Sequence, residues 1–209
     1  MNDKSRSELI ANMMKSKTSI QMLKDAIKEI IPQKKQRIHV IVFCFISLLI
    51  SFLVCHNDNT IKTFANMVEE INVVVIAVFG IVFTGYSLFQ ALIDSNTINR
   101  MLEESENKKT YLQICNEYFL NVMILNIISI IINLIIILLA ESIEREIMLP
   151  IPTAVNIFIS TVTMSIYFLF EFLVMWEMKS FVYNVYQLFN IYACSVAYNK
   201  IVKKDNKEK

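Results

Sequence analysis

Long apolar runs alternate with short polar segments along this chain. Four runs are long enough to cross a bilayer as α-helices, because a hydrocarbon core of about 30 Å needs roughly 20 apolar residues. None of the four contains Lys or Arg; they cover 38–55, 71–93, 119–140 and 153–176. The pattern predicts an all-α integral membrane protein, with a four-helix transmembrane domain over 38–176 and cytoplasmic helical extensions at both ends.

The basic residues predict the orientation of these spans. All but two of the 20 Lys and Arg residues, Lys62 and Arg145, lie in 1–37, 94–118 and 177–209. Cytoplasmic loops carry the excess of Lys and Arg. We therefore expect a multi-pass protein of the cytoplasmic (inner) membrane with both termini in the cytoplasm.

Composition narrows the classes of function. The chain is 55% hydrophobic and 19% charged, has two glycines, and carries a net charge of +1. So few glycines leave no loop of the kind that cradles phosphates, and the charge makes no electrostatic case for nucleic acid. No metal-ligand or catalytic spacing is present, so we expect no enzyme activity and no cofactor.

Residues 1–37 combine an amphipathic helix with a basic anchor. Apolar residues recur over 5–31 mostly in steps of three and four, and Ser5 with Glu8 has the spacing of a capping box. Pro32 is expected to end the helix. Such a helix either packs on the protein itself, lies in the membrane interface, or docks a partner.

Two further segments are expected in the cytoplasm. The connection 94–118 has the pattern of two short helices joined near Asn107. The tail 177–209 contains an aromatic stretch, 181–198, with no Pro or Gly between it and the fourth span. That stretch either continues the fourth helix or lies at the interface, and it is a second candidate contact for a cytoplasmic protein partner.

The first two spans carry small residues at heptad spacing, which favours close helix packing in lipid. The set packs spans one and two together, forms a homo-oligomer interface, or lines a pore. It consists of Ala77, Gly80, Thr84, Ser87 and Ala91 in the second span and Cys44, Ser47 and Ser51 in the first.

The third and fourth spans carry polar stripes at the same spacing. A polar side chain that faces lipid is costly, so the stripes are expected to face protein or water, as hydrogen-bonded contacts or as a polar path. Glu171, the one acidic residue within a span, is a functional candidate. The stripes are Asn126, Ser129 and Asn133, and Asn156, Ser160, Thr163, Tyr167 and Glu171.

The pattern around Val73–Arg100, a hydrophobic stretch in which a Gly is followed by small polar residues, resembles small four-span bacterial membrane proteins. Some of these accompany anti-phage defence systems, and the stretch is similar to the Kiwa membrane subunits among them. The resemblance implies a non-enzymatic, oligomeric membrane component that senses or perturbs the bilayer and docks a cytoplasmic partner.

Two other functions remain open on the sequence. A small channel or carrier would use the polar stripes as its path. An immunity protein against a membrane-targeting toxin would use the outer loops, expected over 56–70 and 141–152.

Overall fold

The computed structural model describes residues 18–30, 37–93, 95–103, 105–106, 109–142 and 152–205, and 94% of them are helical. Two short strands complete the secondary structure of these ranges. In chain order the elements are α2 (Ser19–Ile30), α3 (Arg37–Cys55), α4 (Thr60–Leu92), α5 (Ser95–Glu103), β1 (Ser105–Glu106), β2 (Lys109–Thr110), α6 (Tyr111–Ser142) and α7 (Thr153–Asp205).

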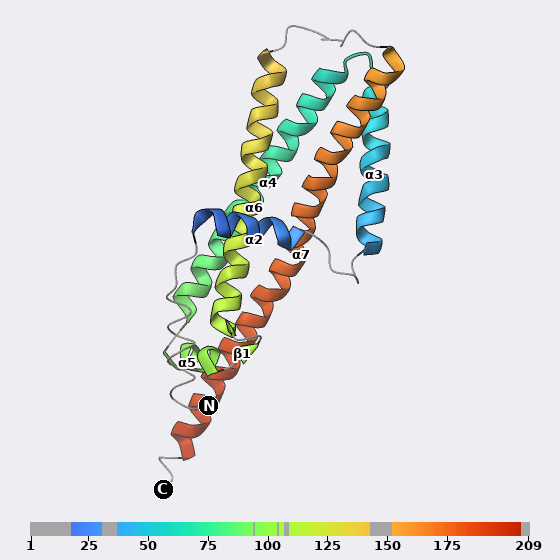
Figure 1. The fold of residues 1–209 in the computed structure, drawn as a ribbon. Helices are drawn as coiled ribbons and strands as arrows, with labels where there is room; N and C mark the ends of the chain where they lie inside the picture. Colours follow the sequence, from blue (N-terminus) through green and yellow to red (C-terminus); the bar gives the residue numbers. More distant parts are fainter. Residues whose placement is uncertain are drawn as a thin grey trace.

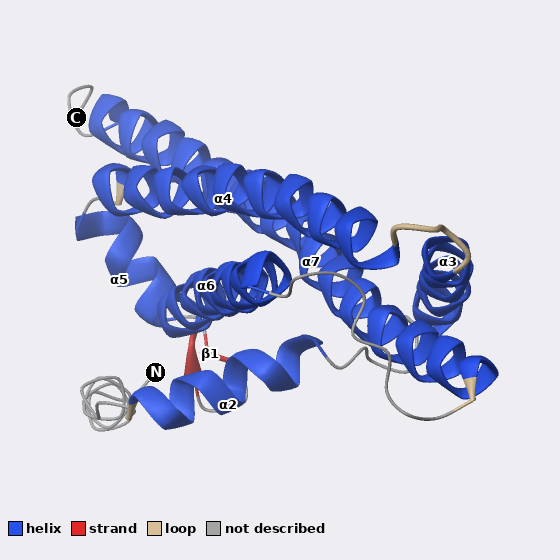
Figure 2. Ribbon diagram, turned by 90° about the horizontal axis from the view of Figure 1, so that it is seen from above, coloured by secondary structure: helices blue, strands red, loops and turns tan. Residues whose placement is uncertain are grey.

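The long helices form an elongated bundle with two levels (Figure 1). The upper level holds α3, the first half of α4, the second half of α6 and the first half of α7. The lower level holds the remaining halves of α4, α6 and α7, together with α5. Helix α2 crosses the bundle between the levels, roughly at right angles to α6, and Figure 2 shows it on the side opposite α4.

Helices α3, α4, α6 and α7 are each long and apolar enough to cross a membrane. Their apolar side chains largely face outward, since only 17% of the most apolar window of α3 is buried inside the chain. An apolar surface of this extent is not stable in water. The four helices predicted from hydropathy are therefore present, and their outer surface suits lipid.

The second span is longer than the sequence predicts. Helix α4 begins at Thr60, whose hydroxyl donates to the Asn57 carbonyl at 2.9 Å. The outer loop expected over 56–70 is therefore wrong from residue 60 onward. The charged residues that suggested a loop, Glu69 and Glu70, lie on an exposed side of the helix, where the backbone stays helical without apolar neighbours.

The connection between the second and third spans also differs from its prediction. One short helix forms, α5, but a β-hairpin follows it, with Ser105 opposite Thr110 and Glu106 opposite Lys109. Helix α6 then begins at Tyr111, eight residues before the predicted third span. Lys109 pairs with Glu117 at 2.6 Å and ties the hairpin to the first turns of α6.

The amphipathic helix expected over 5–31 is shorter in the structure. Thr18 is its N-cap, and a reciprocal pair of bonds joins it to Gln21: Gln21 N–H donates to Thr18 Oγ1 at 3.3 Å, and Thr18 N–H donates to Gln21 Oε1 at 3.0 Å. This capping box marks the N-terminal end of α2. The predicted box at Ser5 and Glu8 lies outside the described residues.

The fourth span continues without a break into the tail. Helix α7 runs for 53 residues, so the aromatic stretch 181–198 is its lower half. Phe181 is buried and meets Phe119 of α6 with ring centroids 5.6 Å apart. Gly85 of α4 makes room for it, since a Cβ there would lie 2.8 Å from Phe181 Cζ. The core of the lower level comprises Val82, Phe89, Met101, Cys115, Phe119, Val122, Phe181 and Leu188.

Candidate functional site

A cluster of buried polar side chains lies between α6 and α7 in the upper level. Helix α6 contributes Asn126, Ser129 and Asn133, and helix α7 contributes Tyr167 and Glu171. All five are less than a tenth exposed, and Ser129 and Asn133 are completely buried. We call these five residues the polar cluster. They come together because polar residues three and four apart share one face of a helix, and the two helices run antiparallel.

Two hydrogen bonds join the helices. The Ser129 hydroxyl lies 2.8 and 2.7 Å from the two carboxylate oxygens of Glu171. One turn further along, the Tyr167 hydroxyl donates to Asn133 Oδ1 at 2.9 Å. The structure therefore brings five predicted stripe residues into one cluster, and four of them form hydrogen bonds across the α6–α7 interface.

The cluster keeps unused hydrogen-bonding capacity. The Asn126 amide donates back to the Val122 carbonyl of its own helix at 2.8 Å. Its Oδ1 and the Nδ2 of Asn133 have no partner among the described residues. Buried polar atoms without a partner cost on the order of 1–3 kcal/mol.

Glu171 has no basic residue as its partner in the described part of the chain. Lys179, the first basic residue after Glu171 in the sequence, places its Nζ 4.9 Å from the centroid of the Trp176 ring. A buried charge needs a counter-charge or several donors. Among the described residues, Ser129 is the only hydrogen-bond donor to this carboxyl group.

A groove gives access towards Glu171 from α4. It has a volume of about 230 Å³ and is lined by Glu70, Ile71, Val74, Val75, Phe168, Glu171, Phe172 and Met175. Glu70 is exposed whereas Glu171 is 3% exposed. Two carboxyl groups from different helices thus border one groove.

The remainder of the predicted α7 stripe lies apart from the cluster. Asn156 and Ser160 are half-buried, and Thr163 is exposed. A polar path along the whole of α6 and α7 is therefore not formed by these residues. Above the polar cluster, α7 runs beside α3 and away from α6 (Figure 1).

The serines of α3 face α7, not α4. Ser47 and Ser51 are buried, and the Ser165 hydroxyl lies 3.5 Å from the Ser47 carbonyl and 2.7 Å from the Thr161 carbonyl. Ser165 was not predicted. The sequence feature that could have identified Ser165 is its small polar side chain four positions after Thr161, on a different side of α7 from Glu171. Cys44, the third member predicted on this span, is exposed.

The small-residue face of α4 is exposed throughout. Ala77, Gly80, Thr84, Ser87 and Ala91 all lie on the surface, so they do not pack spans one and two together. A Cβ at Gly80 would meet nothing within 4 Å. The hydroxyls of Thr84 and Ser87 donate to carbonyls four residues earlier, at 2.8 and 2.9 Å. The face therefore carries no large side chain, its hydroxyls bond within their own helix, and no other described residue covers it.

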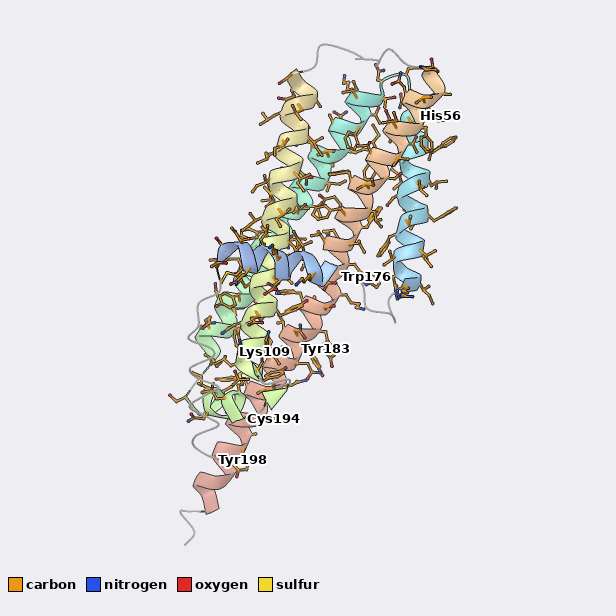
Figure 3. All side chains as sticks on the ribbon, viewed as in Figure 1. His56, Lys109, Trp176, Tyr183, Cys194 and Tyr198 are labelled. Atoms are coloured by element: carbon orange, nitrogen blue, oxygen red, sulfur yellow. The ribbon has the colours of Figure 1, made fainter. Side chains whose placement is uncertain are left out.

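The aromatic surface of lower α7 is also exposed. Tyr183, Tyr186 and Phe189 are 60%, 60% and 45% exposed. Figure 3 shows Tyr183, Cys194 and Tyr198 along the part of α7 that extends below α2 and Trp176. One side of this half-helix thus enters the lower core while the other stays open.

No group of three His, Cys, Asp or Glu positioned for a metal ion occurs among the described residues. The two histidines lie at opposite ends of α3, His39 against Trp176 and His56 against Phe52. Figure 3 labels His56 at the upper end and Trp176 near the level of α2.

Comparison of the chain with models of protein families, with curated proteins and with solved structures finds no match.

Proposed function

We propose that this chain is a non-enzymatic component of a bacterial inner membrane that self-associates, senses or perturbs the bilayer, and docks a cytoplasmic protein. The observation that carries the proposal is the exposed small-residue face of α4. The setting, an anti-phage defence system, rests on the sequence resemblance around Val73–Arg100.

The α4 face suits contact with a second copy of the chain. Small residues let two helices approach closely and pack against each other. Gly80 and Ala77 border an open groove of about 510 Å³ whose other wall is Phe181 and Val185 of α7. A helix from a second copy would enter this groove without displacing a side chain at Gly80.

Helix α7 connects the two ends of the molecule. Its 53 residues extend about 80 Å at 1.5 Å per residue, whereas the hydrocarbon core is about 30 Å thick. The part outside the bilayer carries the exposed Tyr183, Tyr186 and Phe189. A change at Glu171 in the upper level is therefore transmitted along one continuous helix to an aromatic surface that fits a protein partner.

Cysteine cross-linking in liposomes tests self-association. In a chain whose exposed Cys44 and Cys194 are changed to Ser, Gly80→Cys is expected to form disulfide-linked dimers on oxidation. The matched control is Leu138→Cys, because Leu138 is 61% exposed on α6. Equal cross-linking of both variants at high lipid dilution would remove the basis of the proposal.

A plaque assay tests the defence setting separately. Cells that express the chain with its neighbouring genes are challenged with phage, beside cells that carry Gly80→Leu at the same membrane level. We expect fewer plaques on the wild type. Equal plaque numbers with intact cross-linking would reject the defence role and keep the assembly.

A small channel or carrier is the second candidate, favoured by the groove that reaches Glu171. Planar-bilayer recordings of the wild type and of Asn133→Leu distinguish it, because the variant alters the polar cluster directly. Discrete conductance changed by the variant supports a conducting path. A silent membrane at all voltages favours the first proposal.

A further inference from the structure

Helix α2 presents an apolar stripe that nothing in the described chain covers. Ile20, Leu23 and Ile27 are 66%, 42% and 48% exposed. They recur at steps of three and four and therefore share one face of the helix. By contrast, Ala26 is completely buried against Leu125 of α6 and Val174 of α7. The helix is thus held to the bundle by a small residue, while its larger apolar residues point elsewhere.

The position of α2 coincides with the lower end of α3 and with Trp176 of α7. Helix α3 has 19 residues, about 28 Å at 1.5 Å per residue, which matches the hydrocarbon thickness. Its first turn holds His39, whose ring lies 4.8 Å from that of Trp176. Trp residues favour the membrane interface, and Figure 3 shows Trp176 at the end of α2.

The orientation of α2 is that of an interfacial helix. It runs across α6 rather than along it (Figure 1), and it lies on the outer side of the bundle (Figure 2). A helix at this depth whose axis is perpendicular to the spans runs along the bilayer plane. Amphipathic helices bind there with their apolar face about 5–10 Å into the boundary between headgroups and acyl chains.

The handedness of the helix decides where the stripe faces. In Figure 1, α2 runs from left to right in front of α6. A right-handed helix turns about 100° per residue. With Ala26 towards α6, this rotation turns Leu23 and Ile27 towards the upper level, where the spans lie. It turns Lys24 and Lys28, both exposed, away from the bundle.

We propose that α2 lies in the inner headgroup layer, with Ile20, Leu23 and Ile27 among the acyl chains and Lys24 and Lys28 against anionic phospholipid headgroups. The stripe continues the apolar outer surface of the spans, and the two lysines supply the complementary charge. This inference rests on the proposed membrane role and deepens it, because it names the element that contacts the lipid surface.

Spin-label accessibility tests the depth of α2 in the full-length chain. A nitroxide is attached to Leu23→Cys, Ile27→Cys or Lys28→Cys, with Cys44 and Cys194 changed to Ser, in liposomes that contain phosphatidylglycerol. We expect the labels at 23 and 27 to be several-fold more accessible to oxygen and less accessible to a nickel chelate than the label at 28. Equal nickel accessibility at all three positions would overturn the proposal. Protection of 23 and 27 from both reagents would also overturn it, because that pattern marks a protein contact.

A label at Phe45→Cys separates the possible failures. Phe45 is 68% exposed on α3, so its label reports whether the spans are in lipid. Lipid accessibility at 45 with water accessibility at 23 rejects the α2 proposal alone. Water accessibility at both positions rejects the membrane role itself.

The lysines have a test of their own. Lys24→Gln with Lys28→Gln is expected to reduce the difference in label depth at Leu23→Cys between phosphatidylglycerol and phosphatidylcholine liposomes. An unchanged difference would overturn the assignment of these lysines to anionic headgroups.

Discussion

Two faces of this molecule carry the same sequence rhythm and have opposite surroundings. On α6, Asn126, Ser129 and Asn133 are buried against α7, whereas on α4, Gly80 and Thr84 are exposed. Both sets recur at steps of three and four. The comparison teaches that this spacing identifies a helix face and leaves its partner undetermined, because the partner depends on where the other helices lie.

The two faces also differ in what their polar groups need. Ser129 reaches across to Glu171, and the α6 face remains incompletely satisfied at Asn126 Oδ1. Thr84 and Ser87 satisfy their hydroxyls within their own helix. The α6 face therefore requires another helix, whereas the α4 face needs no partner for its polar groups and remains shaped for close contact.

The largest effect is expected at the polar cluster. Ser129→Ala removes the hydroxyl that donates to Glu171 and leaves a buried carboxyl unpaired, which is expected to lower the free energy of unfolding by about 2 kcal/mol. Denaturation in mixed micelles measures it. The double variant with Glu171→Gln is expected to lose less than the sum of the two single changes, and strict additivity would show that the two side chains do not interact.

The two glycines of α4 sharpen the comparison. Gly85→Ala places a Cβ 2.8 Å from Phe181 Cζ and is expected to destabilise the lower level by about 1–2 kcal/mol, as overpacking does. Gly80→Ala meets no atom and serves as the matched control, with equal or slightly higher stability. Thermal unfolding in detergent gives both values, and identical losses would contradict the placement of Phe181.

A smaller effect is expected at the second bond of the polar cluster. Tyr167→Phe removes the donor to Asn133 Oδ1 and is expected to cost about 1 kcal/mol, since hydrogen bonds between membrane helices are modest. The same denaturation assay measures the loss. Tyr183→Phe, at an exposed hydroxyl on the same helix, is the control. An equal loss there would show that the hydrogen bond between Tyr167 and Asn133 does not itself stabilise the protein.

The smallest effect on stability is expected on the α4 face. Ser87→Ala is expected to change the free energy of unfolding by less than about 0.5 kcal/mol, as surface substitutions do. Its hydroxyl bonds only to its own helix. A bulky change at the same position, Ser87→Phe, is expected to leave folding unchanged and to reduce cross-linking of Gly80→Cys. Destabilisation by Ser87→Phe would place this face inside the folded chain.

The four apolar helices could be predicted because hydropathy is a local property of the sequence. Each apolar run of about 20 residues forms a helix, since a helix satisfies its own backbone hydrogen bonds. The ends of these helices were less predictable. Helix α4 begins at Thr60 and passes through Glu69 and Glu70, because charged residues on an exposed side do not interrupt backbone hydrogen bonding. Helix α7 continues past Trp176 because no Pro or Gly interrupts it.

The sequence by itself determined the four apolar helices and the residues that share each face, but it left open whether 181–198 continues the last helix. These properties depend on composition and on a period of 3.6 residues. The tertiary structure decided that Ser129 meets Glu171 and that Phe181 fills the space beside Gly85. It also left Gly80 uncovered. Such pairings join residues far apart in the chain, and they depend on how whole helices cross, which no local pattern encodes.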